Sequence, residues 1–162
     1  GAPLRGGPRH APSPRTDQDG RRGFIARHDG YAQRFGILHE RELTLSADGL
    51  TLAGRDRFLA AGGGKIAGNG HDDVSVRFHL HPDVGLLHEA PDRFVLSAPG
   101  AERWSFTCAE VQPQVEESIY FAALGGPRRS RQIVLSFRAG EVPQVRWTLA
   151  RNGLAGHSGG RR

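Results

Sequence analysis

An alternation of apolar and polar residues, repeated in short segments, constrains the fold of this chain more than any other feature. The clearest example has apolar side chains at every second position, Val74, Val76, Phe78 and Leu80, with polar side chains between them, Ser75, Arg77, His79 and His81. Successive side chains of a β-strand point to opposite faces, so this pattern predicts a strand with one buried face and one exposed face.

The rest of the chain repeats this pattern between turn signals. Further strands are predicted at residues 36–46, 50–58, 94–96, 104–108, 118–123, 132–137 and 145–149. The turn signals include Ala47-Asp48-Gly49, where a residue with positive φ can close a hairpin, and Ala98-Pro99-Gly100-Ala101. No segment shows helical periodicity over three turns. The sequence therefore predicts an all-β fold, a two-sheet and mainly antiparallel β-sandwich.

The predicted core between the two sheets consists of the larger apolar residues on the inward faces of these strands. They are Val76, Phe78, Leu80, Trp104, Phe106, Val134, Val145, Trp147 and Leu149.

The two ends of the chain differ in composition from the middle. Residues 1–22 are rich in proline and glycine and poor in apolar residues, and residues 152–162 are mostly glycine, serine and arginine. Such segments have little apolar surface to offset the entropy lost on ordering. We expect a disordered or wrapping segment at 1–22, the β-sandwich at 23–151, and a disordered tail at 152–162.

The distribution of charge and the cysteine content exclude some classes of function and structure. The net charge is +5, but the basic residues are arginines spread along the chain, with Lys65 the only lysine. A nucleic-acid-binding face usually concentrates basic residues, so nucleic acid is not expected as a partner. Arginine also recognises carboxylates and sulfates, which suits an acidic polysaccharide. Cys108 is the single cysteine, which excludes an internal disulfide, and its apolar strand predicts core packing.

No membrane insertion is expected, because no apolar run approaches the roughly 20 residues that span a bilayer. Residues 1–23 also lack the apolar stretch of a signal peptide.

The segment Arg27-His28-Asp29-Gly30-Tyr31 and the nearby His39 form the first group of residues that could carry chemistry. Imidazole nitrogens and a carboxylate are ligands that a zinc-like ion prefers. The alternative, which the spacing alone favours, is structural. In that interpretation Asp29 and Gly30 form a turn that His28 caps, and His39 is a partly buried strand residue bound to a neighbour.

Two further groups have similar structural alternatives. His79 and His81 lie on one face of a strand and could bind a metal, or could simply face solvent or another domain. Glu116 and Glu117 could act as an acid and base pair. Adjacent strand residues point to opposite faces, however, so salt bridges with neighbouring strands are the favoured interpretation.

A series of motifs in a fixed order resembles the C-terminal region of heparinase II/III-like proteins over about residues 24–150. The motifs are His28-Asp29-Gly30-Tyr31, Phe35-Gly36-Ile37-Leu38-His39-Glu40-Arg41, Leu45-Ser46-Ala47-Asp48-Gly49, Gly54-Arg55-Asp56-Arg57, Arg77-Phe78-His79-Leu80-His81-Pro82, Glu116-Glu117-Ser118-Ile119-Tyr120, Arg131-Gln132-Ile133-Val134-Leu135 and Val145-Arg146-Trp147-Thr148-Leu149.

The resemblance implies a bacterial polysaccharide lyase with an N-terminal α/α toroid followed by a β-sandwich. Such enzymes cleave uronic-acid glycans, including heparin-like glycosaminoglycans and alginate, by β-elimination. Their tyrosine, asparagine and principal histidine lie in the toroid and early sandwich, so no catalytic residue is expected in this chain. The expected location is the periplasm or cell envelope, with the cytoplasm as the alternative. The alternative function is a non-catalytic carbohydrate-binding or interaction module.

The resemblance also implies a structural divalent metal, held by a histidine, an aspartate and a second histidine. Asp29 and His39 match the second and third of these ligands. The first histidine would lie upstream of residue 1, and the spacing between Asp29 and His39 is short for the family. We therefore expect a zinc-like ion only in the full-length protein, and no metal in the isolated chain.

Overall fold

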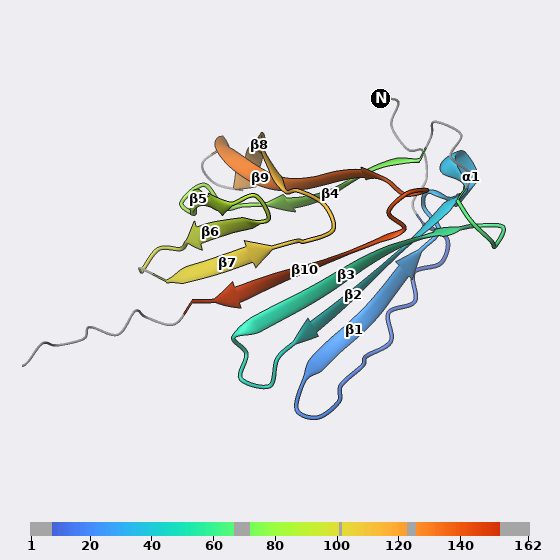
Figure 1. Ribbon diagram of the computed structural model, residues 1–162, viewed down its shortest axis with the longest axis horizontal. Helices are drawn as coiled ribbons and strands as arrows, with labels where there is room; N and C mark the ends of the chain where they lie inside the picture. The colour runs from blue at the N-terminus through green and yellow to red at the C-terminus, as the bar shows by residue number, and fades with distance from the viewer. Residues whose placement is uncertain (1–7, 67–71, 101, 123–125, 153–162) are drawn as a thin grey trace, which may run out of the picture.

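The computed structural model describes residues 8–66, 72–100, 102–122 and 126–152. Two antiparallel sheets face each other (Figure 1). The larger sheet has the order β1 (Arg22–His28), β2 (Ile37–Leu45), β3 (Thr51–Ala60), β10 (Gln144–Arg151), β7 (Arg103–Thr107), β6 (Arg93–Ser97) and β5 (Gly85–Ala90). The smaller sheet has the order β4 (Asp73–His79), β9 (Gly126–Arg138) and β8 (Gln114–Ala122). The predicted two-sheet, antiparallel, all-β fold is confirmed.

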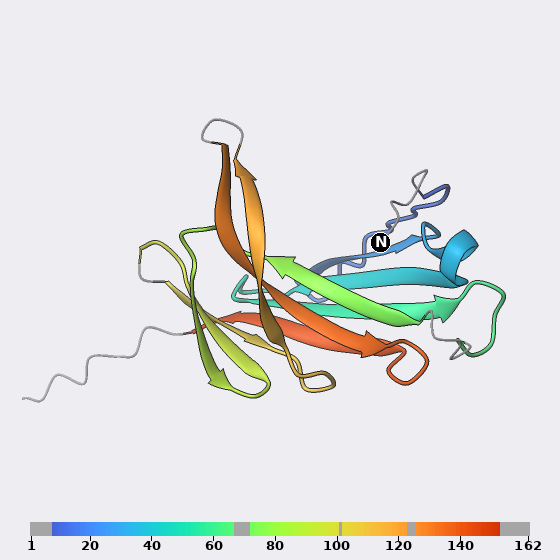
Figure 2. The ribbon, with the colours of Figure 1, turned by 90° about the horizontal axis from the view of Figure 1, so that it is seen from above.

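The predicted hairpins are present, and three elements were not predicted. β2 and β3 join through a turn at Gly49, whose φ is 71°, and β6 pairs with β7 around the second turn signal. The unpredicted elements are β1, β5 and the short helix α1 (Ala32–Phe35). β1 and β5 show weak alternation, which explains why the apolar pattern did not reveal them. The β8–β9 hairpin projects from the body of the domain (Figure 2).

The core prediction is confirmed for four of the nine residues and needs correction for the others. Val76, Phe106, Val145 and Trp147 are buried in the cluster between the sheets. Phe78, Leu80, Trp104 and Leu149 are only partly buried and pack against that cluster. Val134 is buried, but it lies between the core residues Ile133 and Leu135 along β9. Alternation therefore directs its side chain to the opposite face of the strand.

Gly54 creates the space that Trp147 occupies in the core. The two residues are partners in the β3–β10 ladder. A Cβ atom added at Gly54 would lie 2.1 Å from Cζ2 of Trp147. Only a residue without a side chain allows the indole ring to lie flat against β3 at this point.

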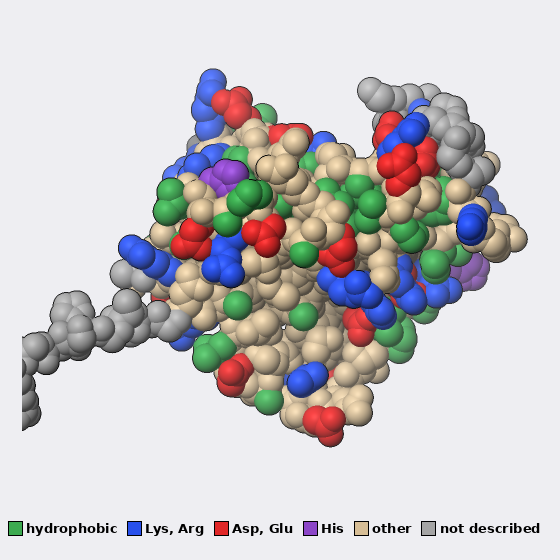
Figure 3. Space-filling view, in the orientation of Figure 1, with side chains coloured by type: hydrophobic (Ala, Val, Ile, Leu, Met, Phe, Trp, Pro, Cys, Tyr) green, Lys and Arg blue, Asp and Glu red, His purple; other side chains and the backbone are tan. Residues whose placement is uncertain are grey.

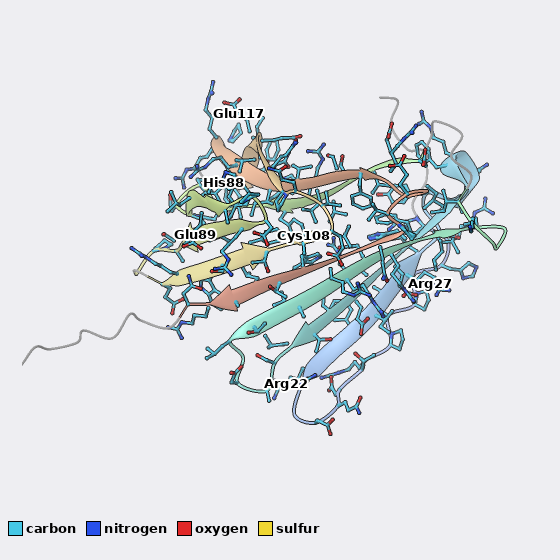
Figure 4. The ribbon with its side chains drawn as sticks, viewed as in Figure 1. Arg22, Arg27, His88, Glu89, Cys108 and Glu117 are labelled. Atoms are coloured by element: carbon cyan, nitrogen blue, oxygen red, sulfur yellow. The ribbon has the colours of Figure 1, made fainter. Side chains whose placement is uncertain are left out.

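The outward face of the larger sheet carries ion pairs between neighbouring strands. Glu40 on β2 binds Arg27 on β1, with Nη2 to Oε2 at 2.6 Å, and also binds Arg57 on β3 (Figure 4). Arg55 pairs with Glu42 in the same way. On the face seen in Figure 3, basic and acidic side chains are correspondingly interspersed. These pairs fix the register of β1, β2 and β3 by matching opposite charges across each ladder.

We expect Glu40→Gln to lower the free energy of unfolding by about 1.5–3 kcal/mol at pH 7, because hydrogen bonds to charged groups are lost. Burial raises the pKa of Glu40, but hydrogen bonds from Arg27 and Arg57 outweigh it, so the folded pKa lies below the ordinary 4.5. A depressed folded pKa stabilises the fold above the unfolded pKa, and this contribution is lost as the pH falls.

The difference between wild type and Glu40→Gln should therefore be constant above about pH 5 and shrink below about pH 4.5. Urea unfolding measured across this range checks the prediction. A difference that stays the same down to pH 3 would contradict the proposed role of the carboxylate.

An extended part of the N-terminal segment lies along the outer edge of β1. The carbonyls of Pro12 and Pro14 accept hydrogen bonds from the backbone N–H groups of Arg27 and Ile25, at 3.1 Å and 3.0 Å. Thr16 donates its N–H to the carbonyl of Gly23 at 2.9 Å. Proline has no N–H of its own, so the segment covers this edge without offering a new donor row there.

Candidate functional site

The candidate site is a cleft of about 340 Å³ between the two sheets. Its floor is the inward face of β2 and β3, one wall is α1 with the turn before it, and the other wall is β4. The lining residues are Tyr31, Phe35, Ile37, His39, Arg41, Phe58, Asp73, Val74, Ser75, Val76 and Arg77. A cleft of this size is typical of a site for a small ligand or for part of a chain.

A fully buried carboxylate, Asp56, lies beneath the floor and organises the polar side chains around it. It accepts hydrogen bonds from Nε2 of His39 at 2.7 Å and from Nε of Arg41 at 2.7 Å. The indole N–H of Trp147 donates to its other oxygen at 2.9 Å. A buried charge is stable only when it is paired and hydrogen-bonded, and these three residues meet that need.

The carboxyl of Asp56 stays ionised because of these partners. Burial raises its pKa, but hydrogen bonds from His39 and Arg41, together with the charge of Arg41, lower it by more. The net pKa lies below the ordinary value for aspartate. The carboxylate beneath the cleft floor is therefore a fixed acceptor that holds the imidazole of His39 and the guanidinium of Arg41 in place.

A chain of hydrogen bonds continues from His39 to the turn before α1. With Nε2 of His39 donating to Asp56, its Nδ1 is an acceptor for Nε2 of His28, at 3.2 Å. Nδ1 of His28 then accepts the backbone N–H of Gly30 at 3.2 Å. Burial and the nearby His39 lower the pKa of His28, which favours the neutral ring that this pattern requires.

Asp29 has a different set of partners from His39. Its Oδ1 accepts the backbone N–H of Arg9 at 2.8 Å and that of His10 at 3.3 Å. The first of these bonds is the main cause that lowers the pKa of Asp29. Asp29 and His39 do not bond to each other, because His28 and Asp56 occupy both ring nitrogens of His39. The structural alternative, with His28 capping the turn at Gly30, is the arrangement seen.

These contacts decide how the pair would fit a metal. His39 could bind an ion through a ring nitrogen only after giving up a hydrogen bond to His28 or Asp56. Asp29 is held by the N-terminal segment. In the arrangement seen here, the two residues do not fit a shared ion, so the metal site stays a prediction about a longer protein.

The other predicted groups lie apart from the cleft floor. His79 bonds with the hydroxyl of Ser118, and His81 packs against Tyr120. Glu116 pairs with Arg77 on β4, and Glu117 lies 3.8 Å from Arg129 on β9. The predicted salt bridge to the neighbouring strand is found for Glu117, whereas Glu116 reaches across β9 to Arg77 on β4.

Cys108 follows β7 (Figure 4) and is buried in the core, as predicted. Burial raises the pKa of its thiol, which disfavours the nucleophilic thiolate.

Asp56 is the central residue of the site, and the sequence reasoning singled it out only as part of a family motif. A signal was present in the pattern of β3. Leu52, Gly54 and Phe58 alternate with Arg55 and Arg57, so Asp56 falls on the apolar face. An acidic residue at such a position requires partners that donate hydrogen bonds. Arg41, which is opposite Asp56 in the β2–β3 ladder, is one of them.

A family model described as "Heparinase II/III-like, C-terminal" matches residues 4–148 of the chain. The chain belongs to the heparinase II/III-like family. The matched region contains both sheets except the last residues of β10, and the resemblance stated from the motifs is confirmed. No curated protein matches the sequence.

Solved structures of a heparan sulfate lyase and of heparinases share the fold. Heparan sulfate lyase HepC from Pedobacter heparinus matches with a TM-score of 0.71 and 9% identity, over 90% of this chain and 22% of that protein. A heparinase III described as the BT4657 gene product gives a TM-score of 0.65 and 10% identity, over 88% and 21%. A further heparinase III gives 0.65 and 7%, over 91% and 22%.

The heparinase II/III-like chain described here thus spans about a fifth of the length of these structures. It corresponds to the C-terminal region of heparinase II/III-like proteins. No helix among the described residues is long and apolar enough to cross a membrane.

Proposed function

We propose that this chain is the C-terminal β-sandwich part of a bacterial polysaccharide lyase that cleaves uronic-acid glycans by β-elimination. The observation that carries the proposal is the family match over residues 4–148, which is specific to the C-terminal region. The shared fold with heparan sulfate lyase HepC supports it. An acidic polysaccharide also suits the arginine-rich composition.

The proposed reaction needs groups that we assign to the rest of the longer protein. In β-elimination a base removes the C5 proton beside a neutralised carboxylate, and the 4-linked oxygen then leaves. By resemblance to the family, the tyrosine, histidine and asparagine that perform these steps lie in the α/α toroid and the early sandwich. His39 is not assigned such a role, because Asp56 and His28 engage both of its ring nitrogens.

In this proposal the cleft network has a supporting role. Asp56 joins β2, β3 and β10 through His39, Arg41 and Trp147. It fixes the shape of the inward face on which the rest of the enzyme would rest. The periplasm or cell envelope is proposed as the location by resemblance to the family, as is a divalent metal at Asp29 and His39 in the longer protein.

We expect the isolated chain to show no lyase activity, because the base and the carboxylate-neutralising group are supplied from elsewhere. Incubation with heparan sulfate and with alginate should produce no ultraviolet absorbance from unsaturated uronates. A heparan sulfate lyase of this family serves as the positive control. Turnover by the purified chain, free of contaminating lyase, would sink the assignment of the catalytic residues to other parts of the protein.

A further inference from the structure

The smaller sheet has two edge strands among the described residues, β4 and β8, and the edge of β4 borders the cleft. Three strands, β4, β9 and β8, face a sheet of seven strands. β4 pairs with β9 on one side only, and its other side forms a wall of the cleft. Unpaired backbone groups along such an edge are a template for another strand.

The backbone groups that point into the cleft can be assigned from two hydrogen bonds at the ends of β4. Leu80 donates its N–H to the carbonyl of Arg131 at 2.9 Å, and Asp72 accepts the N–H of Ala139 at 2.9 Å. The register between β4 and β9 is unbroken between these points. In an antiparallel ladder the direction of the backbone groups alternates by residue. Even-numbered residues of β4 therefore point to β9, and odd-numbered residues point to the open edge.

The odd-numbered residues lie in the cleft wall, but their side chains are engaged on the far face of the sheet. Ser75 contacts Ser136 through its hydroxyl at 3.2 Å, and Arg77 pairs with Glu116. Both residues also line the cleft. Ser75 and Arg77 therefore each present backbone groups to the cleft, an N–H donor and a carbonyl acceptor.

The cleft beside this open edge has an apolar floor, and the more exposed apolar residues lie farther from β4. Ile37, Phe58 and Val76 line the cleft itself. Farther along the inward face, Phe24, Leu43, Leu45 and Leu52 line a second hollow of about 560 Å³. Phe24 and Leu45 are 39% and 36% exposed although they lie on the inward face of the sheet. An extended chain could form backbone hydrogen bonds with the open edge and direct alternate apolar side chains towards this face.

The outer edge of β1 in the larger sheet is covered, unlike the cleft edge of β4. There the segment containing Pro12 and Pro14 already occupies the edge of the larger sheet. Among the described residues, no segment pairs in this way with the cleft side of β4.

We propose that an extended segment from the remainder of the longer polypeptide adds to the cleft edge of β4 as a further strand and places alternate side chains in the cleft that Ile37 and Phe58 line. The inference rests on the proposed function, in which this chain is one part of a longer lyase. The chain covers about a fifth of the similar structures, so the remainder is long enough to supply the strand. The backbone of Ser75 and Arg77 provides the hydrogen bonds, and the inward face of β2 and β3 provides the apolar contact.

Hydrogen–deuterium exchange at single amides tests this proposal. In the isolated chain, the amides of Val74 and Val76 should exchange slowly because they bond to β9, and those of Ser75 and Arg77 should exchange fast. In the longer protein all four should be slow, with exchange at Ser75 and Arg77 reduced by at least about tenfold. Fast exchange at Ser75 and Arg77 in the longer protein would overturn the proposal. Concentration-dependent protection in the isolated chain would also overturn it, because the strand would then come from a second copy.

A pair of variants separates the edge hydrogen bond from ordinary destabilisation. Ser75→Pro removes the N–H directed at the open edge together with the hydroxyl, at a position where proline is tolerated in edge strands. Ser75→Ala removes the hydroxyl but keeps that N–H, and is the control. Ser75→Pro should lower the melting temperature of the longer protein by several degrees more than that of the isolated chain, while Ser75→Ala should affect both alike. Equal effects of Ser75→Pro in the two proteins would count against the added strand. Lyase activity is measured separately. A longer protein that shows no lyase activity would refute the proposed function, whereas the exchange result alone decides whether a strand is added to β4.

Discussion

Asp56→Ala is expected to lower the free energy of unfolding by about 3–5 kcal/mol, because removing one partner of a buried ion pair leaves the other charge uncompensated. The carboxylate is fully buried and accepts four hydrogen bonds, two of them from Arg41. Without it, Trp147 loses the acceptor for its indole N–H, and His39 loses the group that fixes its tautomer. Chemical denaturation at neutral pH provides the measurement.

Asp73→Ala is the matched control for this prediction. The side chain of Asp73 is 80% exposed, and its pairing with Arg138 spans 3.7 Å. An exposed pair of this kind contributes little, so the control should change stability by less than about 0.5 kcal/mol. If Asp56→Ala were as mild as the control, the network around Asp56 would not be holding β2, β3 and β10 together.

The second large effect is expected at Trp147. Trp147→Ala should cost about 3–5 kcal/mol, the range for truncating a large buried aromatic residue. Its ring contacts Phe78 at a centroid distance of 4.8 Å and Phe106 at 6.2 Å, and it is only 5% exposed. Leu87→Ala, at a side chain that is 65% exposed, should stay within about 0.5 kcal/mol.

The contact between Trp147 and Gly54 predicts that substitutions at these two positions are coupled. Gly54→Ala places a methyl group where the indole lies, so it should destabilise the wild-type protein by about 1–3 kcal/mol. In the Trp147→Ala background the space is free, and the same change should be nearly neutral. A double-mutant cycle measures this coupling. Additive effects would show that the indole is not what requires glycine at position 54.

The sequence predicted the strands whose alternation is regular and missed those whose alternation is weak. β4 was predicted from Val74, Val76 and Phe78, because every second residue faces the core. β5 was missed because Leu86 and Leu87 are adjacent, with only the first packed against the core. Such strands are specified by pairing with neighbours, and a pattern within one segment does not contain that information.

The site was harder to predict because it depends on which strands lie side by side. His39 was singled out, but its partners are His28, eleven residues earlier, and Asp56, seventeen residues later. These contacts follow from the β1–β2 and β2–β3 registers. Asp29 seemed to be the natural partner by its place in the sequence. The turn at Gly30 instead leaves its carboxylate bound to the N-terminal segment.

We propose that this domain belongs to an enzyme that breaks uronic-acid glycans by elimination. The most direct measurement is product analysis after the longer protein containing this chain acts on heparan sulfate and on alginate. Elimination predicts products that end in an unsaturated uronate, each lighter by one water than the corresponding product of hydrolysis. Saturated products of hydrolysis, or no cleavage of any uronic-acid glycan by the folded protein, would contradict the claim.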